Sequence, residues 1–546
     1  MRIILIDGYI DEPACLGVPP FISPPIRYIA GAIFSHKSHQ VQYYTIDQLR
    51  HQGLPRGDLY VVVAGTTVPG KYLGGKPVTP RELQTFFKPI DTPAILTGPA
   101  ALHGFHKQYK LDDVFDYIIT GDASLSLSYF LHEGHLENLI RESPQDIQEF
   151  AIQGAQIVTQ HPSYPRVIAE LETYHGCFRS FMGGCSFCTE PLKGPPAFRE
   201  EQSIIQEVQS LYRQGIKHFR LGNQPCLFSY KAQGIGEKEF PRPNPPALKK
   251  LYQGIRAAAP HLETLHMDNA NPGTLAHYPQ ECTQIARIIV QYHTPGDVAA
   301  LGIESTDPRV ISTNNLKVNA KEALRAIELL NKVGAHPGRN GLPELLPGLN
   351  FVYGLPGESK KTYEENYRFL YSVLEKKLLI RRINLRQVIT FPKTPLAHRK
   401  HGHCLKKYFH YHKQKIRETI DRPMLQQVTP PGTILRDAYT ESYKGNLTLL
   451  RQMGTYPLLI AVPTQIPLGH KMDIKITSTG QRSVTGVPYP LTINTASLSL
   501  LQALPGVGRK RAQRLIINRP FSTPSDLIKT LDDKNIAQDI IPYITI

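Results

Sequence analysis

The sequence lacks any long apolar run and contains few cysteines. None of its apolar segments approaches the ~18 consecutive residues that a membrane-spanning helix needs, and the apolar start over residues 1–8 is too short for a signal peptide. Only 7 cysteines occur in 546 residues, three of them in one short loop, which argues against a disulfide framework and favours a reducing compartment. We therefore expect a soluble, cytoplasmic protein with no membrane partner.

Acidic residues are outnumbered, because 46 Asp and Glu stand against 62 Lys and Arg and leave a formal charge of +16. Such an excess favours a polyanionic partner, and nucleic acid is the usual one. A generally basic soluble protein is the alternative, which net charge alone leaves open. The chain is also too long for a single hydrophobic core, so several domains are expected.

Strands alternate with helices in two separate stretches, which predicts an α/β multidomain fold. Residues 1–150 are typical of a doubly wound, Rossmann-like domain, with buried strands such as 2–7 and 59–63. Residues 165–398 contain six further strands with helical crossovers, as in a partial (β/α)6 barrel. These six strands are expected at 167–173, 218–221, 264–267, 299–303, 349–352 and 382–388.

The remaining part of the chain changes character three times. Residues 399–428 form a basic linker that is expected to be helical, with lysines and aromatic residues but no acid over 401–417. Residues 429–493 show short strands with turn signals, typical of a small β-barrel. Residues 494–546 return to a helical pattern around Leu504-Pro505-Gly506-Val507-Gly508.

Three cysteines, Cys177, Cys185 and Cys188, lie in one short loop and are candidate metal ligands. Closely spaced thiolates suit iron–sulfur chemistry, and three of them can hold three irons of a [4Fe–4S] cluster while the fourth iron stays open to another ligand. Zinc is the alternative, because paired cysteines also bind zinc. Structural zinc needs four closed ligands, and only a neighbouring histidine such as His175 could supply the fourth.

Further motifs follow the cysteine loop in the order found in the radical SAM superfamily, which residues 167–395 resemble. Phe187 stands before the third cysteine, where that family commonly has an aromatic residue near adenine. The sequence departs from the family pattern at two points. Seven residues separate Cys177 from Cys185, a longer interval than usual, and Gln224 stands in the second motif where the family has an acidic residue. The later motifs are Gly222-Asn223-Gln224-Pro225, Gly302-Ile303-Glu304-Ser305 and Tyr353-Gly354-Leu355-Pro356-Gly357-Glu358-Ser359.

This resemblance implies a [4Fe–4S] cluster on the three cysteines, with S-adenosyl-L-methionine (SAM) as the second cofactor. It also implies reductive cleavage of SAM to a 5′-deoxyadenosyl radical, with the electron supplied by a donor such as ferredoxin or flavodoxin. Glycines in the motif from Tyr353 to Ser359 permit close approach of the backbone to adenine. The SAM contacts of the family correspond here to Phe187, Gly222, Asn223, Gln224, Glu304, Ser305, Gly354 and Gly357.

Three other polar residues lie near strand ends without fitting a motif. His266 and Asp268 end the third barrel strand, and Cys226 follows the turn at Gly222. Each could face a substrate, but a satisfied core histidine and a small buried cysteine are at least as common. No acid, base or nucleophile is therefore assigned from the sequence.

The two C-terminal units resemble nucleic-acid-binding modules. Residues 454–487 are similar to a TRAM domain, a small barrel known for RNA binding. The run from Leu504 to Ala512 is similar to a helix-hairpin-helix motif, in which two glycines open a tight turn so that backbone N–H groups meet a phosphate. A hairpin that serves protein docking is the alternative. The motif assigns phosphate contacts to Gly506, Gly508, Arg509, Lys510 and Arg511.

The domain order resembles that of the radical SAM methylthiotransferases that modify tRNA. Those enzymes hold a second cluster with N-terminal cysteines, but here Cys15 is the only cysteine before Cys177, so methylthiolation by that route is not expected. Residues 1–150 also resemble the cobalamin-binding domain of radical SAM methyltransferases, notably at Asp7-Gly8-Tyr9. The Asp-x-His-x-x-Gly motif of many cobalamin proteins is absent, and radical SAM methyltransferases can lack it.

The sequence thus predicts a radical SAM enzyme that modifies a nucleic acid, with tRNA or rRNA as the expected substrate and a transferase reaction as the expected chemistry. One alternative is a cobalamin-dependent radical SAM methyltransferase that acts on a protein or a small molecule. Another is a nucleic-acid-binding protein whose iron–sulfur cluster is structural.

Overall fold

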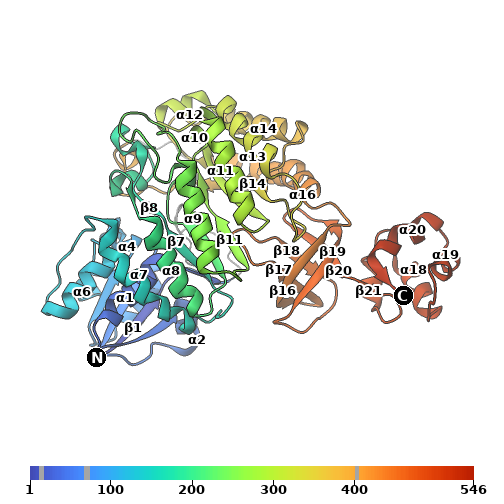
Figure 1. Ribbon diagram of the computed structural model, residues 1–546, viewed down its shortest axis with the longest axis horizontal. Helices are drawn as coiled ribbons and strands as arrows, with labels where there is room; N and C mark the ends of the chain where they lie inside the picture. The colour runs from blue at the N-terminus through green and yellow to red at the C-terminus, as the bar shows by residue number, and fades with distance from the viewer. Residues whose placement is uncertain (11–17, 67–73, 400–404) are drawn as a thin grey trace.

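The computed structural model describes residues 1–10, 18–66, 74–399 and 405–546, so Cys15 lies outside the described residues. Four units follow one another along the chain (Figure 1). The N-terminal sheet domain and the central barrel lie together, while the small β-barrel and the C-terminal helices project to one side. Among the described residues, no helix is long and apolar enough to cross a membrane.

The N-terminal domain is built on a five-stranded parallel sheet in the order β3-β1-β4-β5-β6. This order confirms the predicted doubly wound fold, because the connections reverse direction between β1 and β4. All five residues of β4 are buried, as expected for a strand covered on both faces. The strands are β1 (Arg2–Asp7), β3 (Gln40–Thr45), β4 (Leu59–Val63), β5 (Ala94–Thr97) and β6 (Tyr117–Ile118), and the longest helices are α1 (Pro24–Ser35) and α6 (Ala123–Glu133).

Asp7 ends β1 and is fully buried. Its carboxylate accepts hydrogen bonds from the Tyr9 backbone N–H and from the Tyr43 hydroxyl, both at 2.9 Å. Burial nevertheless raises the pKa of Asp7 to about 7, because the two hydrogen bonds only partly offset the loss of water.

This raised pKa makes a prediction about pH. The folded state holds the proton to higher pH than the unfolded state does, so Asp7 should lower the free energy of unfolding as the pH rises from about 4 to about 7. Asp7→Asn stays neutral at every pH. The thermal unfolding midpoint of the wild type should therefore fall relative to that of Asp7→Asn as the pH rises across this window. Equal pH dependence in the two proteins would show that the carboxyl is not perturbed.

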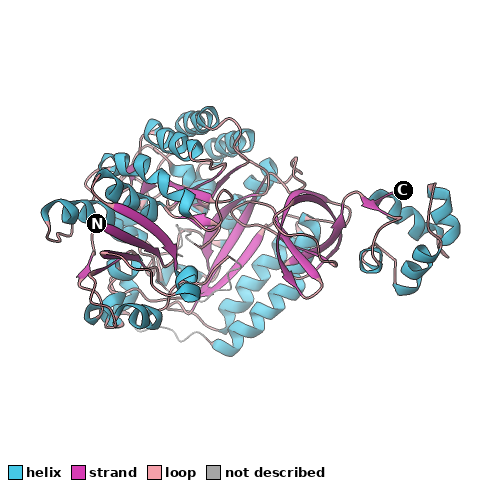
Figure 2. Cartoon of the chain, turned by 90° about the horizontal axis from the view of Figure 1, so that it is seen from below, coloured by secondary structure: helices cyan, strands magenta, loops and turns pink. Residues whose placement is uncertain are grey.

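The central domain is a partial barrel of parallel strands with helices on its outer side (Figure 2). Two sheets, β11-β10-β7-β2 and β12-β13-β14-β15, meet where only Asp268 separates β11 from β12 in the chain. The third predicted strand, 264–267, is β11, and the chain enters the second sheet directly after it. The barrel strands are β7 (Ile168–Glu172), β10 (His218–Gly222), β11 (Thr264–Met267), β12 (Asn269–Ala270), β13 (Asp297–Glu304), β14 (Leu345–Tyr353) and β15 (Arg382–Gln387).

The barrel edge is extended by a strand from the N-terminal domain. This strand, β2 (Phe21–Ile22), pairs in parallel with β7. Two residues are too few for a periodic pattern, so the sequence did not predict it. The outer helices of the barrel are α8 (Glu201–Arg213), α9 (Pro245–Ala258), α11 (Pro279–Tyr292), α13 (Ala320–Gly334) and α14 (Lys360–Glu375).

A buried charge cluster also ties the N-terminal domain to the barrel. Glu207 on α8 accepts hydrogen bonds from Arg27 on α1 and, at 2.6 Å, from Arg199. All three side chains are fully buried. Arg27 donates in addition to the main-chain carbonyl of Glu170 on β7. One carboxylate therefore compensates two buried guanidinium groups across the interface.

Replacing this carboxylate is expected to destabilise the protein strongly. In Glu207→Gln both arginines lose their counter-charge without gaining access to water, and breaking a buried ion pair in this way costs about 3–5 kcal/mol. Urea unfolding should show a lower free energy of unfolding for this variant. The matched control is Glu328→Gln on the exposed side of α13, which should unfold as the wild type does. Equal stability of all three proteins would contradict the role of the cluster.

The small β-barrel is closed by five strands in the order β16-β17-β18-β20-β19, with β18 and β20 parallel. Five-stranded Greek-key barrels of this size include folds that bind oligonucleotides. The short strands expected from the sequence lie at residues 458–462, 472–476 and 483–487 and correspond to β18, β19 and β20, whereas β16 and β17 were not expected. The strands are β16 (Ile434–Lys444), β17 (Leu447–Arg451), β18 (Leu459–Val462), β19 (Lys471–Thr479) and β20 (Ser483–Pro488).

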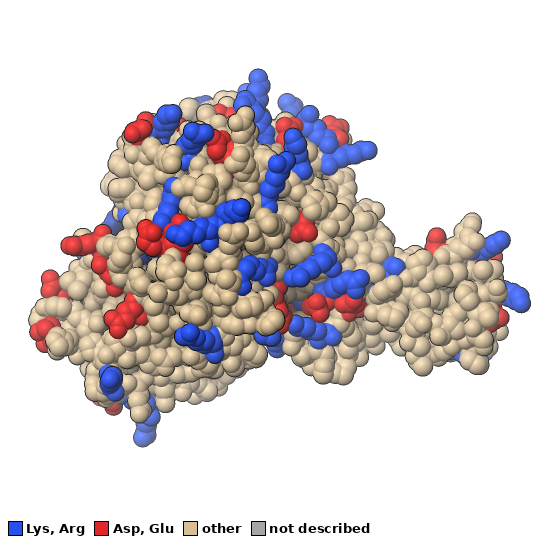
Figure 3. All heavy atoms as spheres, in the orientation of Figure 1, with Lys and Arg blue, Asp and Glu red and all other residues tan. Residues whose placement is uncertain are grey.

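Helices flank the small β-barrel on both sides. Before it come α15 (Lys406–Ile416), a π-helical turn η8 (Arg417–Asp421) and α16 (Arg422–Val428). Lysine and arginine side chains are spread over the visible face of the central and small barrels and over the outer end of the C-terminal unit (Figure 3). After the small β-barrel come α17 (Leu498–Gln502), α18 (Arg509–Ile517), α19 (Pro524–Thr530) and α20 (Lys534–Ile540).

Candidate active site

The cysteine loop follows β7 and is flanked by a short antiparallel pair, β8 (Tyr174–His175) with β9 (Ala197–Phe198). Cys177 precedes a 3-10 helix, η4 (Phe178–Met182), and Gly183 and Gly184 follow it with φ angles of 75° and 61°. Left-handed backbone of this kind suits glycine, and it turns the chain back toward Cys185. The seven residues between the first two cysteines therefore form a compact helical turn, a path that the sequence alone did not give.

Arg179 anchors this turn from inside. Its Nη1 donates to Cys185 Sγ at 3.0 Å and to the Asn315 carbonyl at 2.8 Å, while its Nε pairs with Glu239 at 2.8 Å. The Asn315 side chain donates in turn to the carbonyl oxygens of Met182 and Gly184. A charged donor beside the sulfur stabilises negative charge there, as a metal-bound thiolate requires.

The thiols of Cys177, Cys185 and Cys188 line one cavity of about 510 Å³. Burial raises the pKa of Cys177 to about 11 and also raises the pKa of Cys188, so both thiols are neutral until a metal displaces their protons. Within the described residues, no group of three or more His, Cys, Asp or Glu side chains is arranged to hold a single metal ion. The three thiols share this cavity, and their assignment to a cluster stays a prediction.

Lys317 lines the same cavity and is a residue that no motif revealed. A Cβ added at Gly302 would lie 3.0 Å from its Nζ and 2.5 Å from Glu304 Oε1, so Gly302 permits the close approach of both groups. Burial raises the pKa of Glu304 to about 7, with Lys317 opposing the shift. A cation and a carboxyl group therefore stand together beside the cysteines. Lys317 lies in a loop between helices, where no periodicity or spacing marks it.

The predicted SAM residues fall into two groups. Phe187 and Glu304 line the cavity, and Glu304 ends β13 with a φ angle of 66°. The other group does not line this cavity: Gly222, Asn223, Gln224, Ser305, Gly354 and Gly357.

Asn223 and Gln224 are buried and hold the strand ends together. The Asn223 amide donates to Glu172 Oε2 at 2.7 Å, and the Gln224 amide donates to the Leu221 carbonyl at 3.1 Å. The Gln224 side-chain oxygen accepts from the Thr173 hydroxyl at 3.2 Å. These contacts fix the turn after β10 against the end of β7. A SAM contact from this turn stays a prediction.

The turn after β14 is stabilised by its own hydrogen bonds. Gly354 and Gly357 have φ angles of 93° and 87°, which favour glycine at both positions. The Gly354 backbone N–H donates to Glu358 Oε2 at 2.5 Å. On the neighbouring strand end, the Ser305 hydroxyl accepts from the Asp307 backbone N–H at 3.2 Å. Contacts from these turns to adenine also stay predictions.

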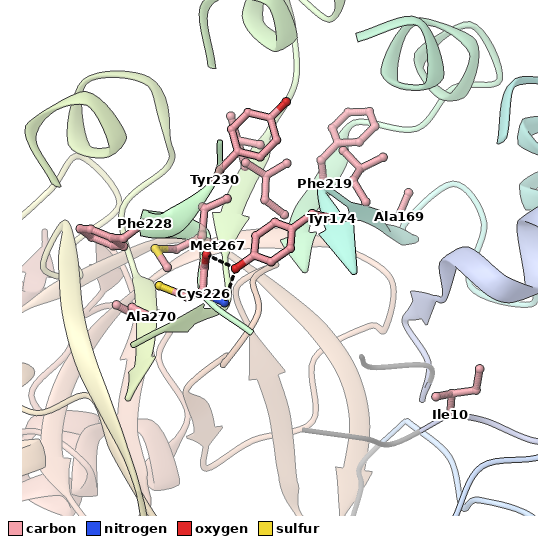
Figure 4. Close-up of a cluster of buried hydrophobic side chains, with 14 of the residues drawn as sticks. Ile10, Ala169, Tyr174, Phe219, Cys226, Phe228, Tyr230, Met267 and Ala270 are labelled. Carbon is pink, nitrogen blue, oxygen red and sulfur yellow. Dashed lines mark hydrogen bonds between the residues drawn. The ribbon is translucent and has the colours of Figure 1, made fainter. Parts of the chain in front are cut away.

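Cys226 belongs to a buried cluster rather than to the cavity (Figure 4). The Tyr174 hydroxyl donates to its carbonyl at 2.6 Å and accepts from its backbone N–H at 3.1 Å. Its Sγ accepts from the Asn271 backbone N–H at 3.1 Å and from the Ser229 hydroxyl at 3.2 Å. These contacts fit the structural role that the sequence favoured for it.

His266 and Asp268 are engaged by a loop of the small β-barrel. His266 Nδ1 accepts from the Thr455 backbone N–H at 3.0 Å, and Asp268 Oδ1 accepts from the Tyr456 hydroxyl at 2.7 Å. Asp268 also forms a buried ion pair with Arg220. This loop, residues 452–458, lines the cavity together with the barrel strands. The small β-barrel thus supplies one wall of the candidate active site.

The C-terminal hairpin has the geometry that its motif predicts. Gly506 has a φ angle of 69°, and Gly508 is the N-cap of α18, with no side chain capping the first turn. Arg509 and Lys510 are exposed there. Arg511 pairs with Asp532 at 2.7 Å and donates to the Gly506 carbonyl at 2.9 Å, so it also braces the turn.

Two relatives match the chain over nearly its full length. An uncharacterised protein of Archaeoglobus fulgidus is 42% identical over 537 residues, which cover 96% of this chain and 97% of the relative. An uncharacterised protein of Methanocaldococcus jannaschii is 42% identical over 505 residues, which cover 89% of this chain and 93% of the relative. The chain belongs to this archaeal protein family.

Shorter similarities concern parts of this family's layout. The helix-hairpin-helix motif matches residues 490–539. A tRNA-2-methylthio-N(6)-dimethylallyladenosine synthase of Desulfotalea psychrophila is 23% identical over 220 residues, which cover 38% of this chain and 45% of that enzyme. A solved structure of the radical S-adenosylmethionine methyltransferase TsrM from Kitasatospora setae, with tryptophan substrate and a SAM analogue, is 15% identical with a TM-score of 0.49, over 72% of this chain and 74% of that chain.

The fold combines parallel α/β sheets, a closed five-stranded β-barrel and a C-terminal helix-hairpin-helix motif. Its partial parallel barrel carries the three-cysteine loop after its first strand. The substrate does not follow from the fold.

Proposed function

We propose that this protein is a radical SAM enzyme that binds a [4Fe–4S] cluster on Cys177, Cys185 and Cys188 and modifies RNA. The observation that supports it most directly is the cavity that these thiols share with Glu304 and Lys317. The donor set fits, because the three thiols come from one loop and line one cavity. A cavity of about 510 Å³ is also within the range of cofactor sites.

The cluster and SAM would supply one-electron cleavage of the sulfonium S–C5′ bond, which yields a 5′-deoxyadenosyl radical. The residues of the chain bind and orient these groups. Arg179 fixes the loop at Cys185, and Glu304 and Lys317 provide a carboxyl and an ammonium group for the polar ends of SAM. Phe187 offers an aromatic face to adenine. The barrel and the loop at residues 452–458 enclose the site, which protects a reactive radical from solvent. A ferredoxin or flavodoxin is the proposed electron donor.

RNA is the proposed substrate because two modules suited to it follow the central barrel, and one of them, the small β-barrel, lines the cavity. The C-terminal hairpin opens α18 without a side-chain cap, so its first backbone N–H groups can bind a phosphate. The small β-barrel supplies a cavity wall, so a nucleic acid bound on it reaches the cysteine loop. The net charge of +16 favours the same partner.

The RNA part of the proposal is tested by nucleoside analysis. Total RNA is incubated with reconstituted enzyme, SAM and reductant, digested, and examined by mass spectrometry. A new or depleted nucleoside should appear with the wild type and not with Cys188→Ala. Identical nucleoside profiles for both proteins would contradict RNA modification and leave the cofactor chemistry to be judged separately.

Cobalamin-dependent methyl transfer to a protein or small molecule is the second candidate, and one observation favours it. Residues in the segments that follow β1 and β4 of the N-terminal sheet, namely Pro19, Thr66 and Gly74, line the cavity of the cysteines. Doubly wound sheets bind ligands at this edge. A corrinoid absorbance spectrum in the purified full-length protein, or after addition of cobalamin, would favour this candidate. A nucleic-acid-binding protein with a structural cluster leaves the cavity unexplained.

A further inference from the structure

The cavity wall contributed by β15 is rich in arginine. Side chains alternate between the two faces of a strand, so Arg382, Asn384 and Arg386 share one face of β15, and all three line the cavity. Arg381 precedes the strand and also lines the cavity. The sixth barrel strand therefore presents guanidinium groups to the same space as the cysteines.

The small β-barrel adds Arg482, which lies in the turn between β19 and β20 and lines the cavity too. The loop at residues 452–458 locks this wall in place. Arg382 stacks 3.9 Å from the centre of the Tyr456 ring, and the Tyr456 carbonyl accepts from Arg381 Nη2 at 2.7 Å. The position of Arg382 is therefore set by packing. We call Arg386, Arg382, Arg381 and Arg482 the arginine track.

Three members of the arginine track are not held by a carboxylate in direct contact. Over the described ranges, Arg382, Arg386 and Arg482 form no salt bridge and no hydrogen bond, in contrast to the cavity residue Arg451, which pairs with Glu441 at 2.6 Å. Carboxyl groups do line the cavity nearby, namely Glu304, Asp268, Asp421 and Glu190. Glu190 pairs with Lys193 at 2.8 Å, and burial raises the pKa of Glu304 while both Lys317 and Arg386 lower it. Asp268 is already engaged by Arg220 and Tyr456. Burial raises the pKa of Asp421 to about 6, opposed by Arg482 and Arg417. The guanidinium groups thus outnumber the carboxylates available to them.

The positive charges continue from the cavity toward the surface. Burial lowers the pKa of Arg381 to about 10, with Arg382 and Arg482 adding to the shift. Burial also lowers the pKa of Lys413 on α15, with Arg417 and Arg482 adding to it. Mutual repulsion of this kind requires proximity. The turn η8 follows α15 directly and places Asp421 on the cavity, so the basic helix α15 ends near the arginine track.

We propose that a single RNA strand runs along the arginine track, with its phosphates held by Arg386, Arg382 and Arg482 and one nucleoside placed in the cavity. This inference rests on the proposed function and names how its substrate enters. A guanidinium group binds phosphate oxygens in bidentate geometry, and such contacts fix the position of a strand without reading its sequence. A series of cations from the cavity to α15 fits consecutive phosphates better than one small phosphorylated molecule.

The test uses the full-length protein and a fluorescein-labelled single-stranded oligouridylate, with fluorescence anisotropy as the readout. Arg386→Gln/Arg482→Gln should weaken binding by about tenfold or more, because charged hydrogen bonds are lost. The slope of log K against log salt should shrink by about 0.7 for each lost phosphate contact. Arg386→Lys/Arg482→Lys, which keeps the charge, should recover part of the affinity. The control Arg213→Gln changes an exposed residue of α8 and should bind within about twofold of the wild type.

Two results would overturn the inference. The first is a double variant that binds the oligonucleotide as tightly as the wild type and has an unchanged thermal midpoint. The second is a wild type that binds uridine monophosphate or inorganic phosphate through these arginines while RNA binding is unaffected by their loss, which would assign a small phosphorylated ligand. Binding needs neither the cluster nor reductant, so a failure of SAM cleavage would be seen separately. Reduced binding with an unchanged thermal midpoint supports the inference.

Discussion

Replacing Cys185 by alanine is expected to abolish both the iron–sulfur cluster and the formation of 5′-deoxyadenosine. Its sulfur lies in the cavity with those of Cys177 and Cys188 and accepts the hydrogen bond from Arg179 at 3.0 Å. With two thiolates left, the loop cannot hold three irons of a [4Fe–4S] cluster. Iron and sulfide analysis and the electron paramagnetic resonance spectrum of the reduced protein measure the first loss. Mass spectrometry of 5′-deoxyadenosine measures the second.

Cys177→Ala and Cys188→Ala should behave in the same way. The control is Cys282→Ala, because Cys282 is buried on α11 and does not line the cavity. This variant should keep a full complement of iron and its 5′-deoxyadenosine yield. A variant of any of the three loop cysteines that still cleaved SAM reductively would remove the basis of the cluster assignment. Loss of iron in Cys282→Ala alone would place the cluster elsewhere.

Arg509→Gln/Lys510→Gln is expected to weaken RNA binding about tenfold and to flatten its salt dependence. Both residues are exposed at the start of α18, where backbone N–H groups are free of side-chain caps. Each lost phosphate contact should lower the slope of log K against log salt by about 0.7 to 0.9. Filter binding of tRNA at several salt concentrations gives both quantities. Removal of residues from Leu498 onward should have the larger effect.

The deletion alone is not decisive, because residues of the hairpin unit and of the small β-barrel share one hydrophobic core. The point variants keep that core intact. Lys529→Gln/Lys534→Gln removes the same charge from exposed positions on α19 and α20 and should have little effect. If both double variants weaken binding equally, the hairpin acts through net charge only. If neither double variant weakens RNA binding, the result favours a role of the hairpin in protein docking.

Much of the fold could be predicted because buried strands leave a strong signal. Leu59–Val63 is apolar throughout and became a fully buried central strand. The strands of the barrel were recognised in the same way, and Asp268 between β11 and β12 did not disturb the pattern. β2 was missed because two residues have no period, and β16 because exposed positions interrupt its alternation. β17 was missed because its buried face includes Thr448 while Leu447 and Leu449 are only half-buried, so its residue types do not follow its burial.

The candidate site was predictable only where chemistry dictates residue type and spacing. Three cysteines in one loop indicate a metal or cluster site from the sequence alone, and the structure places all three on one cavity. Lys317 has no such signature, since its place beside Glu304 depends on how a loop folds back over the barrel. The same holds for Tyr456, which reaches Asp268 across 188 positions of sequence. Contacts between domains of this kind arise from tertiary packing, and a linear pattern does not carry them.

The central claim is that the cysteine loop supports reductive cleavage of SAM and that RNA is the substrate. The most direct measurement is anaerobic reconstitution with iron and sulfide, followed by SAM and reductant, with and without total RNA. The readout is 5′-deoxyadenosine by mass spectrometry. We expect 5′-deoxyadenosine to form and its yield to rise when RNA is present. A protein that carries its cluster and yields no 5′-deoxyadenosine under either condition would contradict it.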